Sequence, residues 1–599
     1  MPGEAYPDLP LFRIPWTALS EADISTRLAS VSTVGPRSAS RASRSLVGKT
    51  VRIVCDNGTT GVDGPTLTYS FPTADSLALT VDDGTPTQAG YRALDMGDIT
   101  FFAHMIPLEL RGYAVVIDNH TNAATVFEIW FGGYEKRKRE IMREVYQGYV
   151  AVEGEEPSTV RHEFNNRLEG GGYYWKQDNG AETLEYYSSI SYTHWVELSR
   201  TNLEPNLGHS APADYIEIGH GRYIYTRTEC EFSGIFTVYA FDVNKLTQVG
   251  LRLGFNAADE LEFYVFSGEG EWLGQIAKFE TFGSTEGGPM LPRPGPGQTE
   301  DVDATAKGAR AVYRPMETYA TMTKEEVDAI VPDNTHVFAQ RVGAGSGATG
   351  MATNVDTPSD KLVGKSATIQ YDNGPTMDYE FTSVDELRYR KDGGAWQTVR
   401  YHAWEAIEGV FLMGYCLKGE PNHDGHITVL DFEEGKATCY NGYLNTPYIA
   451  NEAGCRHLFG KLISEGVPDP GSARHDYTED MLGRAITYSY QPGLTSMHLY
   501  STPGTTSWII FTGTQQMGLE WSGTGAQVKI RDGLYFLYWI EEACNGTLGT
   551  ILLNMRTMHD IGIGYHCGTE GLSMSPVGAL LRHAGQFDVE RFFQDRTRG

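Results

Sequence analysis

The chain has 599 residues, of which 40% are hydrophobic and 12% aromatic, and its 48 basic against 77 acidic residues give a formal net charge of −29. This length exceeds what one hydrophobic core usually organises, so we expect several domains. Such an acidic chain lacks the basic surface with which proteins bind nucleic acids, and an anionic membrane would repel it. We therefore expect neither a nucleic-acid nor a membrane partner, and the composition indicates no particular oligomeric state.

The cysteines and the N-terminus bear on the cellular compartment. Seven cysteines are scattered without CxxC spacing, and the first residues, MPGEAYPDLPLFRIPW, have neither a basic region nor an apolar run. Scattered cysteines in odd number are typical of free thiols in a reducing compartment rather than of a zinc site or a disulfide framework. We predict a soluble cytoplasmic protein without metal or organic cofactor.

In chain order, the first expected element is a short helix inside a leader, residues 1–45. Ser20 is followed by an acid three residues later, which is a helix-start signal. The stretch LVGKTVRIVCDNG (46–58) then predicts a strand that runs into a turn, because Asn and Gly tolerate the positive φ of tight hairpins. Further short segments with alternating apolar residues follow, separated by Gly, Asn and Asp. Residues 46–132 are therefore expected to form a first antiparallel β-barrel.

Two stretches interrupt the alternation at corresponding places. GYEKRKREIMREVYQGY (133–149) and YIANEAGCRHLFGKLISEG (448–466) have a spacing that indicates helices. We predict connecting helices within residues 133–164 and 446–475. Between them, residues 165–286 predict a second barrel, and the Gly/Pro-rich residues 287–360 predict a linker with a short helix that starts at Thr323.

The opening motif returns as LVGKSATIQYDNG (362–374), with eight of thirteen positions identical. Two later pairs also match: AVVIDNHTNAATVF (114–127) with ITVLDFEEGKATCY (427–440), and GRYIYTRTE (221–229) with GLYFLYWIE (533–541). We therefore predict two tandem halves with two barrels each, the later two spanning residues 361–445 and 476–599. The expected fold class is all-β, with four small antiparallel barrels and short helices between them.

Several polar side chains of the last barrel could face its interior together. Residues two apart on a strand project to one face, so Tyr488 and Tyr490 share a surface, as do His498 and Tyr500. In a barrel interior, phenols can donate hydrogen bonds to a substrate carbonyl or carboxylate. Packing in the core without any function is the competing interpretation for each single tyrosine.

Glu541 and its counterpart Glu229 each end a largely apolar strand. A buried carboxylate without a partner is costly, which makes both candidates for a general acid or base. An apolar wall from Trp508, Phe536 and Trp539 would raise the pKa of Glu541 toward neutrality. His423 and His426 have the residue types of metal ligands, but their polar, glycine-containing turn favours a solvated loop.

Each half resembles the MoaF family, whose members have an N-terminal and a C-terminal lipocalin-like domain. The C-terminal resemblance is the more specific and rests on LGRAITYSYQPGLTSMHLY (482–500), TSWIIFTG (506–513) and DGLYFLYWIEEACNGTLGTILLNMRTMHDIGIGY (532–565). It implies that the chain is a fused pair of MoaF-like units and that its four barrels are lipocalin-like.

A more distant resemblance links the barrels to phenolic acid decarboxylases, in which two tyrosines, an arginine and a glutamate bind the substrate and move protons without a cofactor. It places Tyr488, Tyr490 and Glu541 in the last barrel, Tyr371 and Arg390 in the third, and Glu229 in the second. No barrel carries the full set. The predicted catalytic residues are Glu541, Tyr488, Tyr490, Glu229, Arg390 and Tyr371, and the predicted substrate-binding residues are His498, Tyr500, Trp508, Trp539, Trp175 and Trp195.

The leading hypothesis is a cofactor-independent enzyme that acts on a small apolar or aromatic molecule by acid/base chemistry. Isomerisation, decarboxylation or another lyase reaction, and cyclisation need a preorganised pocket and a poised acid or base. The alternative is a carrier or sensor that holds such a ligand unchanged. The sequence does not identify the substrate or the active barrel, although the second half keeps more of the polar residues.

Overall fold

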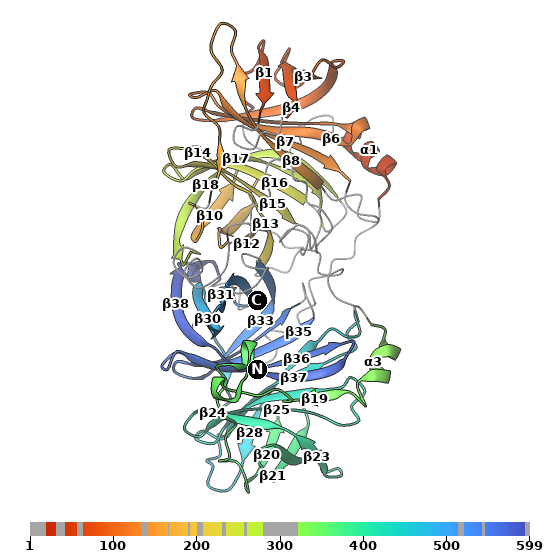
Figure 1. Cartoon of the computed structure of the whole chain (residues 1–599), viewed down its shortest axis with the longest axis vertical. Coiled ribbons are helices and arrows are strands. Elements are labelled where there is room, and N and C mark those ends of the chain that lie inside the picture. Colours follow the sequence, from red (N-terminus) through yellow and green to blue (C-terminus); the bar gives the residue numbers. More distant parts are fainter. Residues whose placement is uncertain are drawn as a thin grey trace.

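The computed structural model confirms an all-β protein built from barrels. It describes residues 19–30, 42–56, 64–132, 141–165, 167–189, 192–199, 208–229, 235–256, 260–278, 322–447, 449–512, 520–541 and 546–593. Within these residues, the strands form one closed barrel, one 21-stranded sheet and one nine-stranded sheet. The 21-stranded sheet contains two barrel units that share a ladder, so four units make up three sheets (Figure 1).

The first barrel is a closed ring in which each strand pairs with the next and β1 pairs with β8, for example Ile53 opposite Val150. Its strands are β1 Thr50–Cys55, β2 Thr66–Ser70, β3 Ser76–Val81, β4 Thr87–Met96, β5 Ile99–Ile106, β6 Arg111–Asp118, β7 Ala123–Phe131 and β8 Ile141–Ala151, with the 3-10 turn η1 Pro107–Glu109 between β5 and β6. The outer strands bury every second residue, whereas β5 is buried on both faces.

The third barrel repeats the first. Strands β23 and β24 are the two ends of its sheet, and the single residue Tyr401 connects them along the chain. Strand β20 pairs with β28, with Ile369 opposite Leu462. Its strands are β20 Ser366–Tyr371, β21 Thr376–Phe381, β22 Glu386–Lys391, β23 Gln397–Arg400, β24 His402–Ile407, β25 Val410–Cys416, β26 Gly425–Asp431, β27 Lys436–Tyr443 and β28 Gly454–Ile463.

The repeated opening motif starts with the same turn in both barrels, while Asn57 and Gly58 of the first copy lie outside the described residues. Gly48 and Gly364 have φ of 80° and 82°, and their N–H groups donate to the carbonyls of Phe71 and Phe381 at 2.7 and 2.8 Å. A positive φ is accessible to glycine without a steric penalty, which explains why both copies keep it. The repeat is thus a structural repeat as well as a sequence repeat.

The second and fourth barrels are also equivalent, and each closes between its first and last long strands. The second contains β9 Glu163–Phe164, β10 Gly171–Gln177, β11 Glu182–Tyr186, β12 Tyr192–Glu197, β13 Gly208–Pro212, β14 Tyr215–Gly219, β15 Arg222–Glu229, β16 Ile235–Asp242, β17 Thr247–Phe255 and β18 Leu261–Ile276. The fourth contains β29 Asp476–Tyr477, β30 Arg484–Gln491, β31 Leu494–Thr502, β32 Thr505–Thr512, β33 Glu520–Arg531, β34 Leu534–Glu541, β35 Thr547–Asn554, β36 His559–Gly568, β37 Gly571–Val577 and β38 Leu580–Phe587.

The four units lie along the long axis of the molecule in the order first, second, fourth, third (Figure 1). Apolar side chains fill the first–second contact, including Phe127 and Phe236, and the third–fourth contact, including Tyr440 and Phe536. The second and fourth barrels meet in the middle, where β18 pairs with β38. Strands between two barrels, such as β15, are therefore buried on both faces.

The predicted connecting helices are wrong where the structure describes them. Residues 141–151 form β8 and residues 454–463 form β28, the strands that close the first and third barrels; residues 133–140 lie outside the described residues. Ring closure pairs their backbone groups on both sides, and this tertiary gain outweighs the local helical pattern. The basic residue Arg143 explains part of that pattern, because it pairs with Asp214 at 2.9 Å across the contact to the second barrel.

The two predicted short helices are confirmed. They are α1 Glu21–Ser30 and α3 Lys324–Ile330, and Thr323 forms a capping box with Glu326. A short strand, β19 Thr335–Val337, follows α3 and pairs with β37, and the 3-10 turns η3 Ala344–Ser346, η4 Gly350–Ala352 and η5 Glu590–Phe592 complete the elements. Among the residues that the structure describes, no helix has the length and hydropathy needed to span a bilayer.

Candidate functional site

The interiors of the second and fourth barrels are built by equivalent strands. Strand β15 ends at Glu229 and pairs with β16, and β34 ends at Glu541 and pairs with β35 in the same register. Alternate residues of each strand face the lumen, so Arg227 in the second barrel corresponds to Trp539 in the fourth. The two lumens can therefore be compared position by position.

Aromatic rings line the fourth lumen. The ring of His498 lies 4.2 Å from that of Tyr488 and 5.1 Å from that of Trp539, and Trp508 lies 6.4 Å from Trp521 between ring centroids. All five side chains are buried. The structure thus brings together most of the residues that the sequence predicts for this barrel.

A chain of polar groups runs through this aromatic interior. The hydroxyls of Tyr488 and Tyr500 are 2.5 Å apart, and that of Tyr490 lies 3.2 Å from Ser496. Burial raises the pKa of Tyr488 well above its usual value, so the phenol stays a proton donor at physiological pH. These hydroxyls therefore offer hydrogen-bond donation in a water-poor interior.

Asp560 on β36 supplies a carboxyl group to the same interior. It is 1% exposed, its Oδ1 accepts a hydrogen bond from the Ala579 N–H at 2.5 Å, and its Oδ2 has no hydrogen-bond partner. Burial raises the pKa of Asp560 to about 8, and the hydrogen bond from the Ala579 N–H lowers it by a smaller amount. The carboxyl therefore holds its proton at neutral pH and can donate it.

Glycines shape the lumen around Trp539. A Cβ on Gly549 would lie 2.5 Å from the Trp539 ring, so only glycine leaves room for this indole. A Cβ on Gly564, which pairs with Gly549, would lie at ordinary contact distance, 3.9 Å from its nearest neighbours. The fourth lumen thus places two glycines, Gly549 and Gly564, beside a tryptophan ring.

Glu541 lies at the end of this lumen and is half-buried. The indole Nε1 of Trp539 donates to its carboxylate at 3.4 Å, and its charge contributes to the raised pKa of Tyr490, for which burial is the main cause. Asp560 inside the lumen and Glu541 at its mouth therefore place carboxyl groups in different surroundings. Such pairs allow one group to act as an acid and the other as a base.

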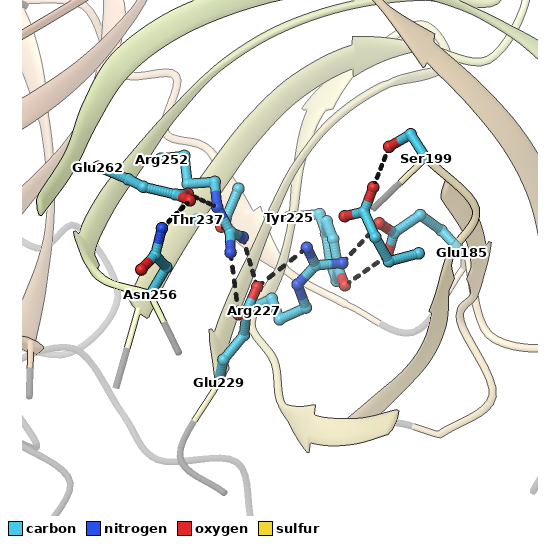
Figure 2. Close-up of polar contacts among 10 residues, drawn as sticks. Glu185, Ser199, Tyr225, Arg227, Glu229, Thr237, Arg252, Asn256 and Glu262 are labelled. Atoms are coloured by element: carbon cyan, nitrogen blue, oxygen red, sulfur yellow. Dashed lines mark hydrogen bonds and ion pairs between the residues drawn. The ribbon is translucent and has the colours of Figure 1, made fainter. Parts of the chain in front are cut away.

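The second lumen instead holds a network of charged side chains (Figure 2). Arg227 Nη1 lies 2.6 Å from Glu185, and Arg227 Nη2 lies 3.3 Å from Glu229. Arg252 also pairs with Glu229, and its Nε lies 2.5 Å from Glu262. Each of these five side chains is at most 8% exposed. Glu229, a predicted catalytic residue, thus bridges two arginines.

Aromatic side chains surround this network. The guanidinium of Arg227 stacks over Trp195 at 4.3 Å, and Tyr225 donates its hydroxyl to Glu185 at 3.1 Å. Trp175 lies deeper, 5.8 Å from Tyr173 between ring centroids. Burial raises the pKa of Glu185, and its contacts with Arg227 oppose that shift. The two predicted tryptophans of the second barrel therefore both line its interior.

The third barrel does not bring its two predicted catalytic residues together. Tyr371 packs in the lumen, 6.2 Å from the ring of His426 between centroids, whereas Arg390 lies on the outer face and pairs with Asp378 at 2.6 Å. Strand alternation explains this, because Tyr389 occupies the inward position next to Arg390. A substrate in the lumen cannot contact both residues.

The turn with His423 and His426 does not form a metal site. His423 Nε2 lies 2.8 Å from Asp328, while His426 points into the barrel and contacts the Tyr415 hydroxyl at 3.1 Å. Among the described residues, no three metal-ligating side chains converge. Next to His423 opens a cleft of about 910 Å³. Its lining combines both charge signs, including His336, Glu386, Arg400, Lys418 and Glu420.

Sequence reasoning missed Asp560, Arg227 and Arg252. Asp560 stands in MHDIGIGY, where glycines occupy the positions two and four residues later, so the carboxyl is followed on its strand face by two positions without a side chain. Arg227 stands two residues before Glu229, and this same-face pair was a readable signal. Arg252 comes from β17, and no local pattern links it to Glu229.

The comparisons with known proteins find two family models in the second half of the chain. The model of the MoaF N-terminal domain matches residues 343–446, and that of the MoaF C-terminal domain matches residues 475–586. No curated protein matched the chain. A solved structure described as a putative beta-lactamase from Burkholderia vietnamiensis aligns with 18% of this chain and 99% of its own length, at 17% identity and a TM-score of 0.15. Both matches therefore fall in the second half of the chain, which is similar to the N-terminal and the C-terminal domain of the MoaF family in that order.

Proposed function

We propose that the chain is a cofactor-independent enzyme that transfers protons to and from a small, largely apolar or aromatic molecule in the fourth barrel. The observation that carries this proposal is the carboxyl group of Asp560, which is buried among tyrosines and tryptophans with one oxygen unpartnered. A protonated carboxyl in an apolar site is a strong hydrogen-bond donor toward a carbonyl or a developing oxyanion.

Each group has a role in this reading. Asp560 donates a proton to an oxygen or carbon of the bound molecule, and the Tyr488–Tyr500 hydroxyl pair donates its remaining O–H hydrogen bond to the oxygen that gains negative charge. Glu541, at the mouth, receives a proton from the substrate or from water. Trp508, Trp521 and Trp539 provide apolar walls that orient a flat ring. Isomerisation, decarboxylation and cyclisation all fit this set of groups.

A solvent-exchange experiment tests the proposal without a known substrate. The full chain is incubated in D₂O with a panel of small aromatic and alicyclic ketones and hydroxycinnamates, and deuterium incorporation is followed by NMR. The wild type is expected to bind and label at least one compound. Asp560→Asn should retain binding and lose labelling by about a hundredfold or more, the usual range for a general acid.

The matched control is Gln248→Asn, because Gln248 occupies the position of Asp560 in the second barrel. This variant should label as the wild type does. Binding without any labelling by the wild type would instead support the alternative, a ligand carrier. Free thiols at Cys55, Cys416, Cys439 and Cys567 support our placement of the protein in the cytoplasm; Cys230 and Cys544 lie outside the described residues.

A further inference from the structure

The cleft of about 910 Å³ beside the third barrel lies where the chain that follows α3 passes β23 and the end of β25. The apolar part of its lining is aliphatic: Val331 and Val337 belong to the chain after α3, Val399 and Leu417 to the barrel, and Leu572 to β37. Among the described residues that line the cleft, none is Phe, Tyr or Trp. A cleft of this size holds a small organic molecule, and this lining suits an aliphatic rather than a flat aromatic body.

Charged side chains also line the cleft, and only some of them are paired. Glu420 pairs with Lys391 at 2.8 Å, and His423 Nε2 lies 2.8 Å from Asp328. Among the described residues, four other charged side chains of the lining form no ion pair: Arg400, Lys418, Glu386 and Asp333. These four comprise two cations and two anions, so the cleft offers both charge signs to a ligand.

Glu386 on β22 and Arg400 on β23 are direct partners across the antiparallel ladder. Side chains of such partners project to the same face of a sheet and lie close together. Glu386 accepts a hydrogen bond from the Thr382 hydroxyl at 3.3 Å, and both charged side chains are exposed at the cleft without pairing with each other. A carboxylate and a guanidinium group therefore stand side by side at the cleft.

The first barrel has the same strands without these two charges. Ser76 and Gly90 are the Cα partners that occupy the positions of the charged pair. The next residue fixes this equivalence, because Tyr91 in the first barrel and Tyr401 in the third each donate their hydroxyl to a backbone carbonyl at 3.1 Å. The strand pairing thus does not depend on the charged pair, which calls for an explanation other than the fold.

We propose that this cleft is a binding site for a small zwitterion, an α-amino acid with an aliphatic side chain. Such a molecule carries its ammonium and its carboxylate on one carbon, so it bridges neighbouring groups of opposite charge. Its ammonium pairs with Glu386, and its carboxylate pairs with Arg400, whose planar guanidinium binds carboxylates through two parallel hydrogen bonds. The aliphatic side chain packs on the valine and leucine side chains of the lining. The site is separate from the fourth lumen and stands whether or not the fourth barrel is catalytic.

Three probes with the same carbon skeleton test the proposal by titration calorimetry on the full chain. They are leucine, isocaproate, which lacks the ammonium, and isoamylamine, which lacks the carboxylate. Leucine should bind the wild type about fivefold or more tightly than either other probe, because it alone satisfies both charges in this half-open site.

Two variants separate the contributions of the two charges. Arg400→Gln and Glu386→Gln should each weaken leucine binding about fivefold. Arg400→Gln should leave isoamylamine binding unchanged, and Glu386→Gln should leave isocaproate binding unchanged. Both side chains are exposed, so neither substitution disturbs the core.

The matched control is Arg388→Gln. Arg388 lies on β22 two residues from Glu386, pairs with Glu380 at 2.7 Å and does not line the cleft, so this variant should bind leucine as the wild type does. The proposal is overturned if leucine does not bind at millimolar concentration or if either single-charge probe binds as tightly as leucine. It is also overturned if both cleft variants bind leucine as the wild type does.

Discussion

The second and fourth barrels have the same strands and opposite interiors. The second lumen is charged around Arg227 and Arg252, and the fourth is aromatic around Trp508, Trp521 and Trp539. Their outer faces agree: Ile224 of β15 packs on the first barrel, and Phe536 of β34 packs on the third. Barrel-to-barrel packing is therefore kept where both copies need it, and the interior has diverged because closure does not depend on it.

The first and third barrels diverge in the same way but less. His104 faces Tyr113 across β5 and β6, and Tyr415 faces His426 at the equivalent rung, so the two residue types have exchanged strands. Burial lowers the pKa of His104 to about 3 and that of His426 to about 4, which keeps both imidazoles neutral. The exchange preserves ring packing, whereas the second and fourth lumens differ in charge, which makes them the places where function is expected to differ.

The largest expected effect comes from breaking the charge balance of the second lumen. Arg227→Ala would leave Glu185 without its arginine and Glu229 with one instead of two. Removing one partner of a buried ion pair typically costs about 3–5 kcal/mol. Hydrogen exchange of the β15 amides should report this loss in the second barrel, since a multidomain chain has no single free energy of unfolding.

The control for this change is a neutral interior made on purpose. A variant with all five charged side chains replaced (Glu185→Leu, Arg227→Met, Glu229→Leu, Arg252→Leu and Glu262→Leu) leaves no charge of this network unpaired. It should recover most of the hydrogen-exchange protection that Arg227→Ala loses. A loss below about 1 kcal/mol in Arg227→Ala would mean that the network is well hydrated and that the contrast between the lumens is overstated.

A smaller effect is expected from the pH dependence of the fourth lumen. The folded pKa of Asp560, about 8, lies above its ordinary value of 3.8, so the folded state holds this proton where the unfolded state has lost it. Stability should therefore fall as the pH rises from about 4 to about 8 and stay level above. Asp560→Asn should reduce this pH-dependent loss of stability by about 2–4 kcal/mol. The reduction is limited because water that enters on ionisation lowers the free-energy cost of the buried charge.

Thermal melting between pH 5 and pH 9 measures this change. Glu520, at the contact between the second and fourth barrels, has a pKa raised by burial to about 8 and contributes with the same sign, so the double variant with Glu520→Gln should flatten the profile further. An unchanged profile in Asp560→Asn would mean that this carboxyl is ionised in the folded protein, and the acid role proposed for it would be lost.

Sequence patterns predicted most of the architecture. Alternation and turn residues indicate the barrels, the repeated motif indicates the two halves, and helix-start signals give α1 and α3. The first closing strand was predicted as a helix because EKRKREIMRE has a helical charge pattern, and only the closed ring shows that Arg143 pairs across a barrel contact. Local periodicity does not contain the information that a strand needs partners on both sides.

The candidate sites were recovered in part for a similar reason. Same-face spacing on single strands correctly grouped Tyr488 with Tyr490 and His498 with Tyr500. Asp560 and Arg252 reach the lumens from strands distant in sequence, where position depends on the register of the whole sheet. Arg390 shows the converse: a resemblance proposed it, and strand alternation places it outside.

The smallest expected effect tests the comparison at one position. Gly549 beside Trp539 corresponds to Thr237 beside Arg227, since each faces its partner across paired strands. Gly549→Thr would place a Cβ 2.5 Å from the indole, and such overpacking costs about 1–3 kcal/mol. Thr237→Gly should cost only about 1 kcal/mol, mainly through backbone entropy. Melting temperatures of the two variants, with near-UV circular dichroism of the tryptophans, measure this asymmetry. Equal losses of stability in the two variants would show that the size of the residue at this position does not distinguish the fourth lumen from the second. A larger loss of stability in Gly549→Thr would show that the fourth lumen depends on glycine at this position, because the Trp539 indole has no other space to occupy.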